Sequence, residues 1–210
     1  KEGFIRKRPS LKPSSQLIYI LSKNQGKIKE INAILSPYSL TIRSLFQDYS
    51  VEEVNETGSS YTENALLKAH HGFKMSGNIC IGEDSGLEID ALDGAPGLFS
   101  ARFGGETLDS KEKNKQILEL LKEVPQEKRS ACFVCVAALV WQKGEKIFEG
   151  RCHGFISQEI RGNSGFGYDP IFILPPYQKT FAELGEKIKN RFSHRAIAFR
   201  RMAEFLLTEM

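Results

Sequence analysis

Two neighbouring carboxylates are the first candidates for chemistry in this sequence. Glu83 and Asp84 lie in the stretch Gly-Glu-Asp-Ser-Gly at residues 82–86, directly after a short apolar run. That run predicts a buried strand at residues 79–82, with both acids at its exit, where α/β sheets bind ligands. Carboxylates there suit Mg²⁺, which takes one or two of them together with substrate phosphates. A plain turn is the alternative, since Asp-Ser-Gly is also favourable turn chemistry.

A polar turn near the start of the chain predicts a place for phosphate. Residues 16–21 have the apolar character of a buried strand, residues 22–26 are polar, and residues 27–35 carry apolar side chains at helical spacing. A helix N-terminus offers free N–H groups and the positive end of its dipole to an anion, and Lys27 adds a cation. Gly26 is the single glycine of the turn, so this is not the P-loop motif. An ordinary strand–turn–helix unit is the alternative.

An aromatic loop favours the binding of a flat ligand. Phe166 stands between Gly165 and Gly167 and is followed by Tyr168 and Asp169. Glycines let the backbone approach a flat ring closely, Phe166 offers a stacking surface, and the acid can accept base N–H groups. A loop with core aromatic residues is the alternative.

Three charged positions indicate chemistry less clearly. His194 and Arg195 open a predicted helix, where cations oppose the helix dipole, so the local conflict favours a function over simple surface charge. Glu56 precedes a capped helix that carries Lys68. A lone acid in a loop is ordinarily solvent-facing, so its type alone does not assign Glu56 a role.

The elements that position these residues form a pattern of mixed strands and helices. Residues 130–142 are apolar on both alternations, which predicts a central strand covered on both faces, and residues 146–156 return as a second strand. Capping boxes are predicted at residues 60–63, 109–112 and 180–183, and Ser193 starts the last helix. The order predicts an α/β fold in which helices flank a sheet with an antiparallel middle portion.

Composition and charge restrict the classes of protein. The 210 residues are 40% hydrophobic and 26% charged, which excludes disordered, fibrous and membrane classes and favours one folding unit. The net charge is +3, but residues 1–16 hold five cations and one anion, so the rest of the chain carries −1. We expect residues 1–16 to be a disordered basic tail and residues 17–210 to be one domain. A nearly neutral body argues against nucleic-acid binding.

Two signals that could suggest other functions are weak. The apolar run 131–141 is shorter than the roughly 20 residues that span a bilayer, so no membrane partner is expected. Cys132 and Cys135 form a Cys-x-x-Cys motif, but residues three apart on a strand point to opposite faces. Buried, reduced cysteines of a cytoplasmic protein are therefore the better interpretation.

Taken together and in order, these stretches resemble the inosine/xanthosine triphosphate pyrophosphatase family. The matching stretches are residues 22–27 (SKNQGK), 56–58 (ETG), 63–69 (ENALLKA), 83–90 (EDSGLEID), 94–97 (GAPG), 100–102 (SAR), 165–172 (GFGYDPIF) and 193–195 (SHR). The likeness begins at about Leu17. It departs from the family at Glu83, where many bacterial members have Asp, at Tyr61, where Phe is usual, and at the bulky Arg191.

The resemblance implies a two-lobed α/β fold with an elongated mixed sheet, an active-site cleft between the lobes, and a homodimer. It implies that ITP, dITP or XTP is hydrolysed to the monophosphate and pyrophosphate with Mg²⁺, for which Mn²⁺ can substitute. Glu56 and Asp84 look like the metal ligands, and Asp84 also like the general base. The substrate-binding residues that it implies are Ser22, Lys23, Asn24, Gln25, Gly26, Lys27, Lys68, Ser85, Phe166, Gly167, Tyr168, Asp169, Lys189, His194 and Arg195.

Three alternatives remain open in the sequence. One is a nucleotide pyrophosphatase for another pool, such as modified pyrimidine or ordinary triphosphates. Another is a nucleotide sensor without turnover, which would be expected to lack an acid at position 56 or 84. The third is an RNA-binding module that uses the basic tail and Phe166, which would be expected to have a basic body.

Overall fold

The fold is built on one mixed sheet. The computed structural model describes residues 17–52, 54–105 and 107–210, so the predicted tail, residues 1–16, lies outside the described residues. The strand order is β2-β1-β3-β5-β6-β7-β8, and β4 pairs with β3 beside this path. The strands are β1 (Ile18–Ile20), β2 (Ile42–Ser44), β3 (Ile79–Ile89), β4 (Pro96–Gly97), β5 (Ser130–Trp141), β6 (Gly144–Ile156), β7 (Phe172–Leu174) and β8 (Lys179–Thr180).

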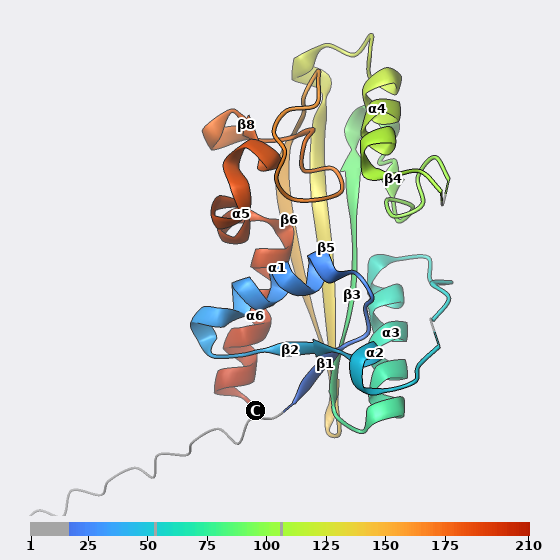
Figure 1. Cartoon of the computed structure of the whole chain (residues 1–210), viewed down its shortest axis with the longest axis vertical. Coiled ribbons are helices and arrows are strands. Elements are labelled where there is room, and N and C mark those ends of the chain that lie inside the picture. Colours follow the sequence, from blue (N-terminus) through green and yellow to red (C-terminus); the bar gives the residue numbers. More distant parts are fainter. Residues whose placement is uncertain (1–16, 53, 106) are drawn as a thin grey trace, which may run out of the picture.

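Helices cover both faces of this sheet. The α-helices are α1 (Gln25–Leu35), α2 (Leu45–Asp48), α3 (Tyr61–Ser76), α4 (Ser110–Leu120), α5 (Phe181–Phe192) and α6 (His194–Thr208). Helix α3 packs on one face of β3 and β5, whereas α6 packs against β5 and β6 and carries α1 beside it. Figure 1 shows β3, β5 and β6 running most of the length of the molecule, with α4 near one end and α3 and α6 near the other.

The central strand is the one expected from the sequence. All residues of β5 from Ala131 to Val140 are buried, and β5 pairs antiparallel with both β3 and β6. One alternation of β5 packs against Ala65 and Ala69 of α3, and the other contributes to the cores below α6 and α5. Burial on both faces explains why the segment is apolar at every position.

Two of the hydrophobic clusters formed by the described residues share the long strands and lie one in each lobe. One core holds Ile81 and Leu139 together with residues of α1 and α6. The other holds Leu87 and Phe133 together with residues of α4 and α5. On β3 the polar residues 83–86 fall between these cores, so the lobes meet where the strand is least apolar.

Strand β3 corrects the expectation of a short strand that ends before the acids. It is continuous from Ile79 to Ile89, and Asp84 pairs with Val136 in its middle. Asp-Ser-Gly at residues 84–86 is compatible with a turn, but a Cβ at Gly86 would collide with the Gly97 carbonyl oxygen, and one at Gly82 would collide with the Ala65 carbonyl oxygen of α3. The glycines are therefore needed for close packing of a straight strand.

The other edge of β3 is only partly covered. Strand β1 pairs with it up to Ile81 and β4 pairs with Leu87 and Glu88, while no described strand pairs there with residues 82–86. Ser22 and Asn24 follow directly after β1. This five-residue segment, which we call the open edge of β3, therefore lies beside the predicted phosphate-binding turn.

The predicted helix starts are largely confirmed. Asp109 and Thr180 form complete capping boxes with Glu112 and Glu183. Ser60 caps α3 as expected, but the Glu63 carboxylate accepts hydrogen bonds from the Ser59 backbone N–H and hydroxyl, so that box is only half formed.

The structure also bears on the cysteines and on membrane spans. The four cysteines are buried and free, as the opposite facing of Cys132 and Cys135 predicts. Within the described ranges, no helix is both long and apolar enough to traverse a bilayer.

Candidate active site

Strand alternation separates the two neighbouring acids. Glu83 points to the face of the sheet covered by α1 and α6, where its carboxylate contacts Lys27 (2.7 Å) and Arg195 (2.9 Å). Asp84 points to the opposite face, toward Asn64 and Lys68 of α3. Successive side chains of a strand alternate in this way, so the pair cannot act as one dicarboxylate.

Asp84 instead finds its acidic partner in a distant loop. Lys68 Nζ lies 2.6 Å from Glu56 Oε1 and 3.8 Å from Asp84 Oδ1, so one cation joins the two carboxylates. Asn64 Nδ2 donates to Asp84 Oδ2 at 3.1 Å, and Asn64 Oδ1 accepts from the Gly58 backbone N–H at 2.8 Å. Helix α3 thus brings the Glu56 loop to β3.

Burial and the neighbouring charges change the pKa of Asp84. Burial raises the pKa of the Asp84 carboxyl above its ordinary value of 3.8, and Glu56 raises it further, while Lys68 opposes both effects. A carboxylate with a raised pKa is a better proton acceptor than an exposed one. Its two lone-pair-rich oxygens also remain hard donors for a divalent cation.

The acid pair fits a magnesium ion by the chemistry of its donors. Glu56 and Asp84 already converge on one positive charge, the ammonium group of Lys68. Among the described residues there is no cluster of three or more His, Cys, Asp or Glu suited to a metal. A site with two carboxylates is the kind that Mg²⁺ completes with water and substrate phosphates.

The opposite face carries a buried network of ion pairs. Arg195 joins Glu83 and Glu30, each at 2.9 Å, and Lys189 joins Glu30 (3.2 Å) and Asp169 (2.7 Å). Burial acts to raise the pKa of Glu83, but Lys27 and Arg195 outweigh it and hold that pKa well below the ordinary range. For Asp169, burial dominates and raises the pKa despite Lys189.

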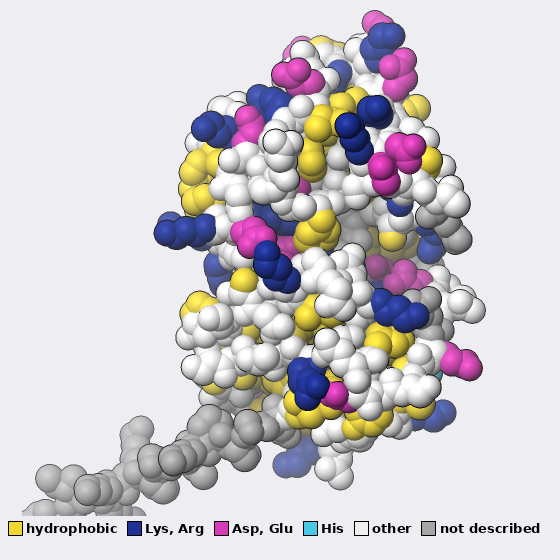
Figure 2. Space-filling model, in the orientation of Figure 1, with side chains coloured by type: hydrophobic (Ala, Val, Ile, Leu, Met, Phe, Trp, Pro, Cys, Tyr) yellow, Lys and Arg dark blue, Asp and Glu magenta, His cyan; other side chains and the backbone are white. Residues whose placement is uncertain are grey.

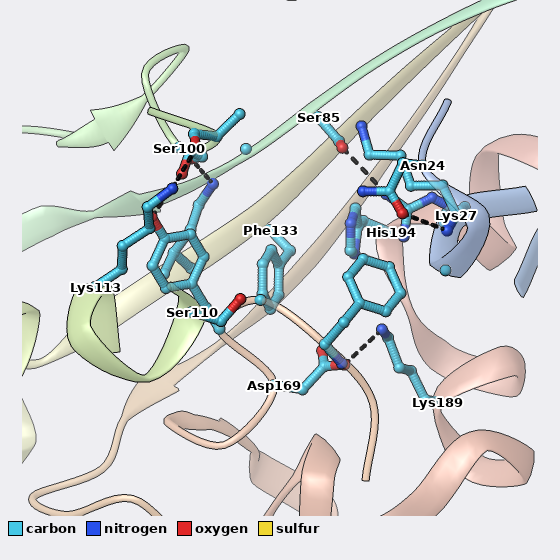
Figure 3. Close-up of a pocket in the computed structure, with 18 residues that line it drawn as sticks. Asn24, Lys27, Ser85, Ser100, Ser110, Lys113, Phe133, Asp169, Lys189 and His194 are labelled. Atoms are coloured by element: carbon cyan, nitrogen blue, oxygen red, sulfur yellow. Dashed lines mark hydrogen bonds and ion pairs between the residues drawn. The ribbon is translucent and has the colours of Figure 1, made fainter. Parts of the chain in front are cut away.

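A cavity of about 380 Å³ lies against this network. Its walls come from both lobes: α1 and the start of α6 on one side, and Ser100, Ala101 and the start of α4 on the other. Figure 3 shows Lys27, Asn24 and Ser85 at one end of the cavity and Ser100 and Lys113 at the other, with Phe133 between them. In Figure 2 the surface is hollowed at mid-height, between the part that carries α4 and the part that carries α3.

Phe166 presents an aromatic ring to this cavity. Its ring is half-buried, with Lys189 Nζ 4.2 Å and Arg195 Cζ 5.7 Å from the centroid. The Asp169 carboxylate accepts a hydrogen bond from the Phe166 backbone N–H at 2.8 Å. The exposed part of such a ring can stack on a flat ring, while the two cations beside it favour negative charge nearby.

His194 behaves differently from a surface cation. It is fully enclosed and its ring stacks on Phe133, with centroids 4.6 Å apart and planes 10° apart. Burial, followed by the positive charges of Arg195 and Lys189, lowers its pKa well below 6.5, so the ring is neutral. The predicted conflict with the helix dipole therefore concerns Arg195 alone, and Glu30 and Glu83 neutralise it.

The structure brings most of the expected site residues together, in two groups. Eleven of them line the cavity: Asn24, Gly26, Lys27, Ser85, Phe166, Gly167, Tyr168, Asp169, Lys189, His194 and Arg195. Glu56, Lys68 and Asp84 form the acid pair and its cation on the other face. The two groups meet at the open edge of β3, because Ser85 is adjacent to Asp84.

Three expected residues stay outside both groups. Ser22 Oγ accepts from the Asn24 backbone N–H at 3.2 Å, which shapes the turn. Lys23 Nζ lies 5.0 Å from the centre of the Phe46 ring. Gln25 is the first residue of α1 and does not line the cavity. Their places in substrate binding remain predictions.

A comparison with family models identifies the family of this chain. The model of the Ham1 family matches residues 18–205, which is nearly all of the described chain. The chain belongs to the Ham1 family.

Named relatives and solved structures agree with this assignment. A dITP/XTP pyrophosphatase of Bacillus cereus is 42% identical over 91% of this chain and 95% of its own, and one of Dictyoglomus thermophilum is 44% identical over 91% and 94%. A HAM1 protein from Coxiella burnetii superposes with a TM-score of 0.83 at 38% identity, covering 93% of this chain and 100% of that one. A Staphylococcus aureus Ham1 protein gives 0.79 at 37% identity.

Several residues at this Ham1 site were not found from the sequence. Glu30 holds both Arg195 and Lys189, and Phe133 supports His194, yet the sequence patterns single out neither as a site residue, and Phe133 belongs to the apolar run of the predicted central strand. Spacing gave one usable signal, because Glu30 follows Lys27 by one helical turn and so shares its face. Phe133 gave none, since its partner comes from the register of β5 against α6.

Proposed function

We propose that this chain hydrolyses purine nucleoside triphosphates whose base is hypoxanthine or xanthine (ITP, dITP and XTP) to the monophosphate and pyrophosphate, with Mg²⁺ bound. The Ham1 family assignment and the names of its relatives support this substrate class. The observation that carries it is the open edge of β3, which joins an aromatic, cationic cavity on one face to an acid pair on the other.

The substrate lies across that edge. The base stacks on Phe166 in the cavity, and the phosphates pass Asn24, Lys27 and Ser85 toward Lys68. The N-terminus of α1 adds the positive end of its helix dipole along this path. Lys27 and Lys68 each contact a carboxylate, on opposite faces of the sheet. Each ammonium group can exchange that partner for a phosphate oxygen when the substrate enters.

Asp84 takes the proton from the attacking water in this proposal. Asn64 and the Ser85 backbone N–H fix its carboxylate by donating to Oδ2 and Oδ1 respectively. Glu56 and Asp84 hold the magnesium ion, which when bound neutralises phosphate charge and polarises the phosphate oxygens; Mn²⁺ would serve in the same place. Lys68 and Lys27 stabilise the negative charge that develops on the departing pyrophosphate.

The base is selected by hydrogen-bond donors. Hypoxanthine and xanthine present a 6-oxo acceptor, whereas adenine presents a 6-amino donor. Arg195 carries only donors, and the buried Nδ1 of the neutral His194 has no partner in the described part of the chain, so it can donate in the matching tautomer. A polar site of this kind rejects the wrong base by about 10⁴-fold, since buried groups would be left unpaired.

One panel of substrates tests the proposal. Purified protein is supplied with Mg²⁺ and with ITP, dITP, XTP, GTP or ATP in separate reactions, and pyrophosphate release is measured. We expect release from the first three substrates, with kcat/KM far above that for ATP. Folded protein that releases none from ITP, dITP or XTP would overturn the proposal, and equal rates with ATP would reassign it to the general triphosphate pool.

The assembly and location of the enzyme are part of the proposal. We infer a homodimer in the cytoplasm, with residues 17–210 as a single two-lobed unit and with no nucleic-acid partner. Sedimentation velocity tests the dimer, because a monomer at micromolar concentration would contradict it.

A further inference from the structure

The start of α4 reaches the cavity from the lobe opposite to α1. Ser110 and Lys113 line the cavity itself. The next residue, Asn114, is 1% exposed, and its Nδ2 donates to the Gly167 carbonyl at 3.1 Å, across 53 positions of sequence. This bond ties the first turns of α4 to the loop that presents Phe166.

That loop has little stiffness of its own. Gly165 and Gly167 on either side of Phe166 have φ values of 79° and 62°, in the left-handed region that glycine adopts readily. Three hydrogen bonds hold the peptide groups of Phe166 and Gly167: the Phe166 backbone N–H donates to the Asp169 carboxylate, the Phe166 carbonyl accepts from the Asp169 backbone N–H at 3.3 Å, and the Gly167 carbonyl accepts from Asn114. The two peptide units that flank Phe166 are thus held from within the loop by Asp169, whereas the next unit, between Gly167 and Tyr168, is held from α4.

Helix stability does not explain an asparagine at this position. The N-terminus of α4 is already satisfied by the capping box of Asp109 and Glu112. Asn114 is a weak helix former, and its buried Oδ1 has no partner among the described residues, which is costly. The feature that remains is the bond from Nδ2 to Gly167.

We propose that Asn114 is a positioning residue for base recognition, which acts by holding the Phe166 ring in its stacking orientation. The inference rests on the proposed function, since it concerns the same site. Asn114 does not line the cavity, so its effect on substrate passes through the Gly167 peptide and Phe166.

The test is a double-mutant cycle with Asn114→Leu and Phe166→Ala. Leucine has nearly the same volume and removes both the donor and the unpaired oxygen, so we expect unchanged or higher thermal stability. The KM for dITP should rise by about tenfold at most, the size of one net hydrogen bond, with little change in kcat. Inhibition by pyrophosphate, which has no base, should be unaffected. In the Phe166→Ala background, Asn114→Leu should add nothing.

Ile117→Val is the matched control, because Ile117 is fully buried on the same helix one turn later and does not line the cavity. Its KM should equal that of the wild type. An equal rise in KM with and without the Phe166 ring, or a parallel loss of pyrophosphate inhibition, would overturn the inference. So would a fall in stability without a change in KM.

Hydrogen exchange separates this inference from the proposed function. In Asn114→Leu, the amides of residues 165–169 should exchange faster, while those of α5 should not. Wild-type protein that hydrolyses none of the substrates would overturn the proposed function, yet the exchange rates would still report on the restraint. Unchanged exchange at residues 165–169 would refute the restraint even in an active enzyme.

Discussion

At the scale of single residues, the site depends on which way each side chain of β3 points. Glu83 and Asp84 are neighbours, but the first belongs to the ion network beneath the cavity and the second to the acid pair with Glu56. Their replacements should therefore have different effects. The first should mainly alter stability and the second mainly turnover.

Asp84→Asn should remove turnover and keep nucleotide binding. The amide preserves the shape of the side chain but cannot take a proton, so kcat should fall by about 10²–10⁴-fold, as for loss of a general base. Calorimetric titration with ITP should still show binding. Glu88→Gln is the control, because Glu88 lies on the same face of β3 and pairs with Arg151 at the surface. Near-normal turnover of Asp84→Asn would exclude it as the base.

Glu83→Gln should be detected first as a loss of stability. Removing this carboxylate leaves Arg195 and Lys27 with one buried partner fewer, and breaking a buried pair costs about 3–5 kcal/mol. Urea denaturation monitored by circular dichroism measures the change. A stable Glu83→Gln protein with lost turnover would instead give Glu83 a direct part in chemistry.

His194 should make stability depend on pH. Its folded-state pKa lies well below the ordinary 6.5, because the ring is buried beside Arg195 and Lys189. Below pH 6.5 the unfolded chain takes up a proton that the folded chain does not, so stability falls as pH falls, by about 1.4 kcal/mol per unit. His194→Gln should lose less stability than the wild type between pH 7.5 and 5.5. Parallel curves for the two proteins would contradict this explanation.

At the scale of elements, the close packing of α6 on the sheet sets the position of His194 and Arg195. Gly150 of β6 has no side chain, and a Cβ there would collide with the His194 carbonyl oxygen and crowd the Ala198 backbone N. Helix and strand can therefore approach more closely than any larger residue permits. Because α6 packs this closely on β6, the first turn of α6 can reach the cavity.

Gly150→Ala should displace α6 and weaken both the fold and the site. Overpacking of this kind costs about 1–3 kcal/mol. The KM for dITP should rise as well, because the first turn of α6 carries two cavity residues. Gly144→Ala is the control on the same strand, since a Cβ there meets only Trp141 at an ordinary 3.6 Å. Equal melting temperatures and KM values for the two variants would refute the close-packing role.

Local patterns predicted many of the elements, and long-range pairing decided the rest. The complete capping boxes at Asp109 and Thr180 and the central strand β5 follow from spacing within a few residues. The continuity of β3 through Gly82 and Gly86 did not, because it depends on pairing with β5 some 50 positions later. Thr180 caps a helix as predicted, and α5 continues beyond a kink at the non-helical Gly185.

The site divides in the same way. Motif residues such as Phe166 and Lys189 could be selected from residue type and order, and the cavity contains them. Glu30 and Phe133 could not, since their partners lie on α5 and α6, more than 60 positions away. Strand alternation predicts that Glu83 and Asp84 point to opposite faces. We did not expect this arrangement, because the strand was predicted to end before both residues.

At the scale of the whole molecule, all the proposed chemistry lies within the matched region. The family match covers residues 18–205, and the two groups of site residues fall between Asn24 and Arg195. A chain that begins at Leu17 should therefore keep its melting temperature. Its kcat/KM for dITP should stay within about a factor of two, which corresponds to a few tenths of a kcal/mol in activation free energy. A large loss in either quantity would give residues 1–16 a role in the enzyme.

The open edge of β3 also sets a minimum length for the substrate. In the proposed binding mode, a nucleotide whose base rests in the cavity would reach the acid pair on the other face only by extending its phosphates past Ser85. Cleavage shortens that bridge, so the monophosphate product keeps its contacts with the cavity and loses those with Lys68 and Glu56. Under this proposal the sheet edge would select substrates by the length of their phosphate chain, and the reaction itself would produce a molecule too short to contact both faces.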